Sequence, residues 1–175
     1  MSINFFQNFP DITYKNKKAK NILVRAALRE VVKQNTQIYL PLTLEDGERP
    51  DMIAQDLYGN AGYTWLIKFS NNIIDPYFDW ILTDYQFEEF LKKKYGSLEA
   101  AHETVMYYET ISNENYHTVN KDTYDLMDAP TKALYQEISA YEYESQKNEA
   151  KRNIAIISPE FSSIIANELE KKLND

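Results

Sequence analysis

The sequence contains no cysteine and only four glycines among its 175 residues. Without cysteine, neither a disulfide framework nor a thiolate metal site can form, and so few glycines indicate few flexible joints. No run of about 18 or more apolar residues occurs, so we expect no membrane-spanning helix. Residues 1–14 lack the basic start and long apolar centre of a signal peptide, and we expect the chain to be made and folded in a cytoplasm.

Sequence motifs of the common enzyme classes are also missing. There is no P-loop, no Gly-x-Ser-x-Gly and no Gly-x-Gly-x-x-Gly. His102 and His117 lie far from each other and from any acidic cluster with the spacing of metal ligands. Paired carboxylates such as Glu88-Glu89 are expected by chance among 27 acidic residues, so a glycosidase is the weaker alternative. We predict that the protein is not an enzyme and holds no cofactor and no metal.

Acidic residues outnumber basic residues, and the two kinds are unevenly distributed along the chain. The net charge of −8 argues against a nucleic-acid partner, because phosphates are bound by clustered lysine and arginine. Residues 15–33 carry seven basic groups and one acid, whereas residues 103–149 carry ten acids and three lysines. A chain with this polarity can attach to copies of itself or to a neighbour through complementary patches; the alternative is two solvated faces.

Aromatic residues make up 14% of the chain, and 14 tyrosines account for most of them. Tyrosine combines apolar area with a hydroxyl group, which suits surfaces that become buried when proteins associate. Lining of a small core is the alternative for any single tyrosine. At the N-terminus, residues 5–14 predict an extended arm or edge strand. Residues 18–34 then predict a helix with a basic face that includes Arg25.

The centre of the chain predicts a strand, two short helices and a second strand. The first strand covers residues 38–44, where Pro41 indicates a sheet edge or bulge. Pro50 begins a helix that Gly59 ends, and a second helix covers residues 62–70. The second strand is expected at residues 73–74, and a capping box starts another helix at Asp84. Five side chains should form the shared core: Leu44, Ile53, Leu57, Leu66 and Ile74.

The C-terminal part predicts strands followed by a helix. A strand at residues 105–111 should pair with residues 116–119 as a hairpin. Residues 138–143 alternate apolar and polar side chains, which favours a strand, and residues 153–157 form another apolar run. Ser158-Pro159-Glu160 is a helix start, with an N-cap residue, proline at the first position and an acid in the first turn.

The central motifs resemble two related families. Asp46-Gly47, Ile53-Ala54, Tyr58-Gly59 and Asp75-Pro76 stand in the order typical of a LysM module. A closer resemblance is to the LysM-like baseplate wedge proteins of contractile-tailed phages, the gene-product fifty-three family. Residues 46–50, 57–59, 63–65, 71–76 and 79–80 carry it, with further similarity at residues 9–14, 21–25, 148–154 and 159–161.

This resemblance implies an α+β fold with a LysM-like βααβ centre, flanked by an N-terminal arm and helix and a C-terminal hairpin and helix. The expected domains are residues 1–36, residues 37–96 and residues 97–175. The resemblance also implies a structural virion protein, assembled in the host cytoplasm. It would contact other wedge proteins, adjacent wedges and hub proteins, and help the wedges close into a ring around the hub.

Two alternatives to the wedge function remain open at this point. One is a LysM protein that binds peptidoglycan, which the aromatic bulk of Tyr63 and Trp65 disfavours, and the other is a cytoplasmic scaffold unrelated to phages. We expect no contact with nucleic acid or membrane. The candidate partner interface comprises Phe5, Phe6, Phe9, Tyr14, Arg25, Tyr63, Trp65, Trp80 and Arg152.

Overall fold

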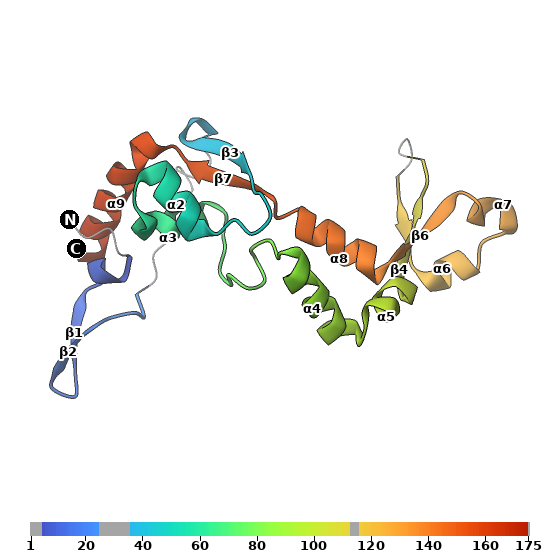
Figure 1. Ribbon diagram of the computed structural model, residues 1–175, viewed down its shortest axis with the longest axis horizontal. Helices are drawn as coiled ribbons and strands as arrows, with labels where there is room; N and C mark the ends of the chain where they lie inside the picture. The colour runs from blue at the N-terminus through green and yellow to red at the C-terminus, as the bar shows by residue number, and fades with distance from the viewer. Residues whose placement is uncertain (1–4, 25–35, 113–115, 175) are drawn as a thin grey trace. The chain divides into compact units, whose positions relative to one another are not determined.

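A computed structural model describes residues 5–24, 36–112 and 116–174. The fold is α+β, as the sequence predicts, and the chain forms two compact units (Figure 1). Unit 1 consists of Met1–Trp80 together with Arg152–Asp175, and unit 2 of Ile81–Lys151. These limits differ from the expected domains, because the C-terminal segment returns to the first unit.

The centre of unit 1 is a two-stranded antiparallel sheet with two helices packed beside it. Strand β3 (Tyr39–Thr43) pairs with β7 (Asn153–Ile157), which lies more than 100 residues later. Helices α2 (Pro50–Tyr58) and α3 (Thr64–Ser70) are joined by a 3-10 turn, η3 (Ala61–Tyr63). The predicted strand at residues 73–74 is wrong, because these residues lie in an irregular loop and β7 pairs with β3 instead.

Local sequence signals explain the helix ends of this unit. Pro50 occupies the first turn of α2, and Gly59 ends that helix with a positive φ of 70°. At the end of α3, Asn72 adopts φ 53°, and the N–H of Ile73 donates to the carbonyl of Lys68. This arrangement is a Schellman motif, with asparagine in the position that glycine usually takes.

Strand β3 is an edge strand, as Pro41 predicts. The N–H of Leu44 donates to the carbonyl of Arg152, and the N–H of Ser158 donates to the carbonyl of Ile38. The alternate residues Tyr39, Pro41 and Thr43 therefore direct their main-chain groups away from β7. Proline therefore removes the central N–H from the outer edge. That absence discourages pairing with a foreign strand.

The N-terminal segment of unit 1 folds as a short 3-10 helix, η1 (Phe5–Asn8), and a hairpin. The hairpin consists of β1 (Asp11–Tyr14) and β2 (Lys17–Lys20). The predicted helix at residues 18–34 is wrong at its start, because residues 18–20 belong to β2; residues 25–34 lie outside the described residues. Lys15 and Asn16 form the turn with φ values of 50° and 59°, the geometry of a two-residue type I′ hairpin.

Unit 2 combines a helical cluster with a three-stranded antiparallel sheet. The sheet has the order β5 (Thr118–Val119), β4 (Val105–Thr110), β6 (Tyr135–Ser139), so the predicted hairpin of β4 and β5 is confirmed. The cluster comprises α4 (Asp84–Tyr95), α5 (Leu98–Glu103) and α8 (Ala140–Glu149) around Phe87 and Leu91. Two short helices, α6 (Lys121–Asp125) and α7 (Ala129–Lys132), lie between β5 and β6 in sequence.

Capping boxes set two helix starts in unit 2. The box of Thr83 and Gln86 begins α4, as predicted. A second box, formed by Ser139 and Glu142, begins α8. The strand predicted at residues 138–143 is therefore wrong after Ser139, where β6 ends and the helix starts. The apolar and polar residues alternate there, but the capping box starts a helix.

The core of unit 1 agrees with the sequence except at one position. Leu44, Ile53 and Leu66 are buried and Leu57 is half-buried, as predicted, but Ile74 is exposed.

Helix α9 (Pro159–Asn174) begins where Ser158-Pro159 predicts. Among the described residues, no helix is both long and apolar enough to cross a membrane. Further elements are η2 (Thr36–Ile38) and the loop at residues 71–80.

Candidate protein-binding surface

Several of the aromatic residues predicted to contact partners are covered within unit 1 itself. Phe9 and Trp65 are only 2% and 7% exposed, and Tyr63 is also buried. The Phe5 ring lies 5.7 Å from the Trp65 ring and 4.9 Å from the Phe9 ring. Edge-to-face and tilted contacts at these distances are the favourable ones for aromatic pairs. These side chains therefore anchor the N-terminal segment to α3.

Trp80 and Arg152 stabilise the turn that leads into α2. The Trp80 indole is buried, and its Nε1 donates to the carbonyl of Glu48 at 2.9 Å. The Arg152 guanidinium donates from Nη1 to the carbonyl of Leu44 at 2.8 Å, while the N–H of Leu44 donates to the carbonyl of Arg152. Both residues are thus committed to contacts inside unit 1.

Two other predicted interface residues do lie on the surface. Phe6 and Tyr14 are both more than half exposed, Phe6 beside the anchor and Tyr14 at the tip of β1. Arg25 lies outside the described residues. The structure therefore separates the predicted set into core residues and surface residues, a distinction that the sequence alone does not make.

Three exposed large apolar side chains of unit 1 lie in the loop at residues 73–79, which we call the 73–79 loop. Ile74 is 91% exposed, Tyr77 81% and Phe78 64%. Large apolar side chains exposed side by side in a short loop are unusual in a monomeric protein and commonly mark an interface. Burial of one such side chain contributes about 1.5–3 kcal/mol.

Two aspartates fix the main chain of the 73–79 loop. Asp79 Oδ2 accepts hydrogen bonds from the N–H of Ile74 at 2.9 Å and from the N–H of Asp75 at 2.8 Å. Asp75 Oδ1 accepts from the N–H of Tyr77 at 2.9 Å, and its carbonyl accepts from the N–H groups of Phe78 and Asp79. Because the loop is held in one shape, little conformational entropy remains to be lost on binding.

The 73–79 loop is not predicted as a surface from the sequence. Ile73-Ile74 has the apolar character of a strand, and Tyr77 and Phe78 are not among the predicted interface residues. A usable signal was present in Asp75-Pro76 with Asp79 four residues after Asp75, since an aspartate side chain commonly caps the main chain of a turn.

Both histidines and the half-buried Tyr58 make contacts within the protein. His102 stacks on Tyr141 with ring centroids 4.1 Å apart, and His117 hydrogen-bonds the Tyr135 hydroxyl. Burial raises the pKa of Tyr58 to about 12, and the Tyr58 hydroxyl donates to the carbonyl of Ile157 at 2.8 Å. Among the described residues, no group of three or more histidine, aspartate or glutamate side chains is placed to hold a metal ion.

Comparison with known proteins identifies a family for this chain. A family model described as base plate wedge protein 53 matches residues 6–171, nearly the whole chain. A search of curated proteins returns no match. The matched region includes the 73–79 loop, the hairpin of β1 and β2, and all of unit 2.

Proposed function

This chain belongs to the base plate wedge protein 53 family, a family of structural proteins of the phage tail baseplate, and we propose that it joins neighbouring wedge proteins and helps the wedges close into a ring around the hub. As a baseplate protein it interacts with other baseplate proteins. The proposed mechanism is burial of apolar surface, without catalysis, during assembly in the host cytoplasm.

The exposed apolar side chains of the 73–79 loop carry this proposal. Ile74, Tyr77 and Phe78 together offer a hydrophobic contact of the kind that dominates binding energy at interfaces, where tyrosine is enriched. The loop is fixed by Asp75 and Asp79 before any partner arrives. A preformed loop of this kind suits insertion into an apolar groove of a neighbouring wedge protein.

The exposed N-terminal residues extend the proposed interface. Phe6 is exposed beside the anchor formed by Phe5 and Phe9, and Tyr14 is exposed at the tip of β1, so a partner can contact both without disturbing the core of unit 1. We include Arg25 in the same interface on the basis of its basic surroundings in the sequence. Contact with the hub belongs to this proposal as well.

Co-purification with the neighbouring wedge proteins tests the proposal. The triple variant Ile74→Ser/Tyr77→Ser/Phe78→Ser should lose most of its retention on wedge partners, because each lost burial removes about 1.5–3 kcal/mol. The matched control is Met52→Ser/Tyr85→Ser/Leu126→Ser, which changes three exposed apolar side chains elsewhere. Equal retention of the two triple variants would refute the loop as the interface.

Binding to peptidoglycan is the competing function, suggested by the LysM-like order of motifs. Retention of the full chain on purified sacculi at physiological salt would support it and would count against the wedge proposal. We expect that the chain does not bind the sacculi and remains in the supernatant when they are pelleted.

A further inference from the structure

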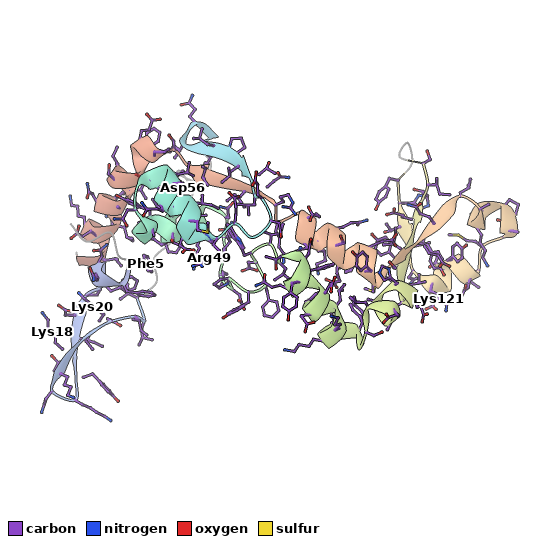
Figure 2. All side chains as sticks on the ribbon, viewed as in Figure 1. Phe5, Lys18, Lys20, Arg49, Asp56 and Lys121 are labelled. Carbon is purple, nitrogen blue, oxygen red and sulfur yellow. The ribbon has the colours of Figure 1, made fainter. Side chains whose placement is uncertain are left out.

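Among the residues that the structure describes, no helix or strand covers either face of the hairpin of β1 and β2. Every residue of both strands is exposed. A two-stranded hairpin without a covered face is marginally stable by itself in water. The hairpin also carries four lysines, including Lys18 and Lys20 (Figure 2), against the single aspartate Asp11. A basic element of this kind gains stability when an acidic surface covers it.

The two faces of the hairpin differ in how their charges are used. On one face, Asp11 pairs with Lys18 at 2.9 Å and with Lys20 at 3.1 Å. The cross-strand pairs Ile12↔Ala19 and Tyr14↔Lys17 share the other face. This second face joins exposed apolar area to Lys17, with Lys15 at the adjoining turn, and is the face available for docking.

Unit 2 is acidic, whereas the hairpin is basic. Residues 81–151 contain 14 acids and seven lysines and no arginine, a net charge of −7. Three carboxylates from three elements, Glu103 of α5, Glu137 of β6 and Glu142 of α8, line one hollow of about 540 Å³ together with His102 and Tyr141. No lysine or arginine lines this hollow.

The hollow lies beside an outer strand of the sheet. In the sheet order, β6 has β4 on one side and no strand of the described residues on the other. The N–H of Ile111 donates to the carbonyl of Leu134, so the alternate residue Glu137 directs its main-chain groups away from β4. An added strand could therefore pair with β6 next to the three carboxylates.

We propose that the hairpin of one copy docks on the β6 edge and acidic hollow of unit 2 in a second copy of this chain. Lys15 and Lys17 face Glu103 and Glu137, and Ile12 and Tyr14 cover apolar surface beside β6. Within one sequence, the basic hairpin and the acidic β6 edge have complementary charge, and this complementarity selects a second copy as the occupant.

Such a contact joins different surfaces of the two copies, so it is heterologous. Repeated head-to-tail, heterologous contacts generate a closed ring when the rotation between copies closes. This inference rests on the proposed function, since it assigns part of the wedge-to-wedge connection to contacts between copies of this protein.

Zero-length carbodiimide cross-linking of the full chain tests the proposal, because it joins a lysine amine directly to a carboxylate. Light and heavy isotope-labelled copies are mixed in equal amounts at low ionic strength. We expect mixed-isotope cross-links from Lys15 or Lys17 to Glu103 or Glu137. Lys15→Glu/Lys17→Glu should weaken self-association about tenfold or more in sedimentation measurements, as expected when attractive charge pairs become repulsive, and adding Glu103→Lys should restore part of it.

The control is Lys171→Glu/Lys172→Glu, an equal charge change on exposed lysines of α9, which should leave self-association unchanged. Cross-links within one copy only, hairpin cross-links to other carboxylates, or self-association that ignores the hairpin variant would each overturn the proposal. Retention on other wedge proteins is measured separately. A hairpin variant that no longer self-associates but still binds the other wedge proteins supports both proposals. Whether the 73–79 loop variant loses binding to those wedge proteins tests the proposed function alone.

Discussion

The side-chain amide of Asn71 exchanges two hydrogen bonds with the main chain of Ala155, 84 residues later in the sequence. Asn71 Nδ2 donates to the carbonyl of Ala155 at 2.8 Å, and the N–H of Ala155 donates to Asn71 Oδ1 at 2.8 Å. The amide thereby occupies the edge of β7 that faces away from β3 and ties α3 to that strand. One asparagine thus joins the two separate segments of sequence that form unit 1.

Replacement of Asn71 should destabilise unit 1. Asn71→Ala leaves the N–H and carbonyl of Ala155 without this partner, which should lower the free energy of unfolding by about 1–3 kcal/mol. Urea denaturation followed by tryptophan fluorescence measures the change, since both tryptophans belong to unit 1. The neighbouring variant Asn72→Gly is the control and should be neutral or slightly stabilising, because Asn72 has φ 53°. Equal effects of the two variants would contradict this role of Asn71.

Asn148 makes the corresponding contact in unit 2. Its Oδ1 accepts from the N–H of Leu82 at 2.9 Å, and its Nδ2 donates to the carbonyl of Leu82 at 3.0 Å. Asn148→Ala should speed hydrogen exchange at the Leu82 amide about fivefold or more, the factor for the loss of about 1 kcal/mol. Exchange in α2 should not change, because α2 belongs to unit 1. Unaltered exchange at Leu82 would disprove the contact.

Stability of unit 2 should depend on pH through Glu144. Burial tends to raise the pKa of the Glu144 carboxyl, but the hydrogen bond from Lys94 at 2.6 Å and the nearby Tyr95 and Lys147 lower the pKa by more. Because the folded pKa is lowered, the stabilisation is present above the unfolded pKa and is lost as the pH falls through the folded pKa.

Glu144→Gln should therefore cost about 1–2 kcal/mol at neutral pH and progressively less in acid, the estimate being modest because Lys94 is partly exposed. Glu89→Gln, which removes an exposed pair with Lys92, should show almost no effect at either pH. Thermal unfolding across the acidic range measures both variants. A cost for Glu144→Gln that stays constant with pH would rule out the ionised carboxylate as the cause.

Rigidity of the 73–79 loop should depend on Asp79. Asp79→Ala removes the acceptor of the Ile74 and Asp75 amides, so their hydrogen exchange should accelerate while overall stability changes little. Retention on wedge partners should fall as well, because the loop then loses conformational freedom on binding. Unchanged exchange at both amides would show that other contacts hold the loop.

The elements predicted from sequence are those specified by neighbouring residues. Pro50 and Gly59 bound α2, and Thr83 with Gln86 begins α4, because each signal acts within a few residues. The partner of β3 could not be predicted in this way. Strand β7 lies beyond all of unit 2, and Ile73-Ile74 is closer in sequence and equally apolar. Asp75-Pro76 and Asp79 signal the turn that follows, but they do not show whether Ile73-Ile74 pairs with β3.

The candidate surface could not be predicted from local sequence signals either. Burial of Trp65 and exposure of Tyr77 depend on which elements pack together, and both residues are aromatic residues between turn signals in the sequence. The hairpin of β1 and β2 was missed because Lys15-Asn16 is a weaker type I′ signal than Asn-Gly, and the lysines that follow it also suit a helix.

The most direct test of the central claim is the structure of an assembled baseplate that contains this chain. We expect Ile74, Tyr77 and Phe78 to be buried against another wedge protein, with the 73–79 loop in the shape fixed by Asp79. A baseplate in which this chain is present and the three side chains remain exposed to solvent would contradict it.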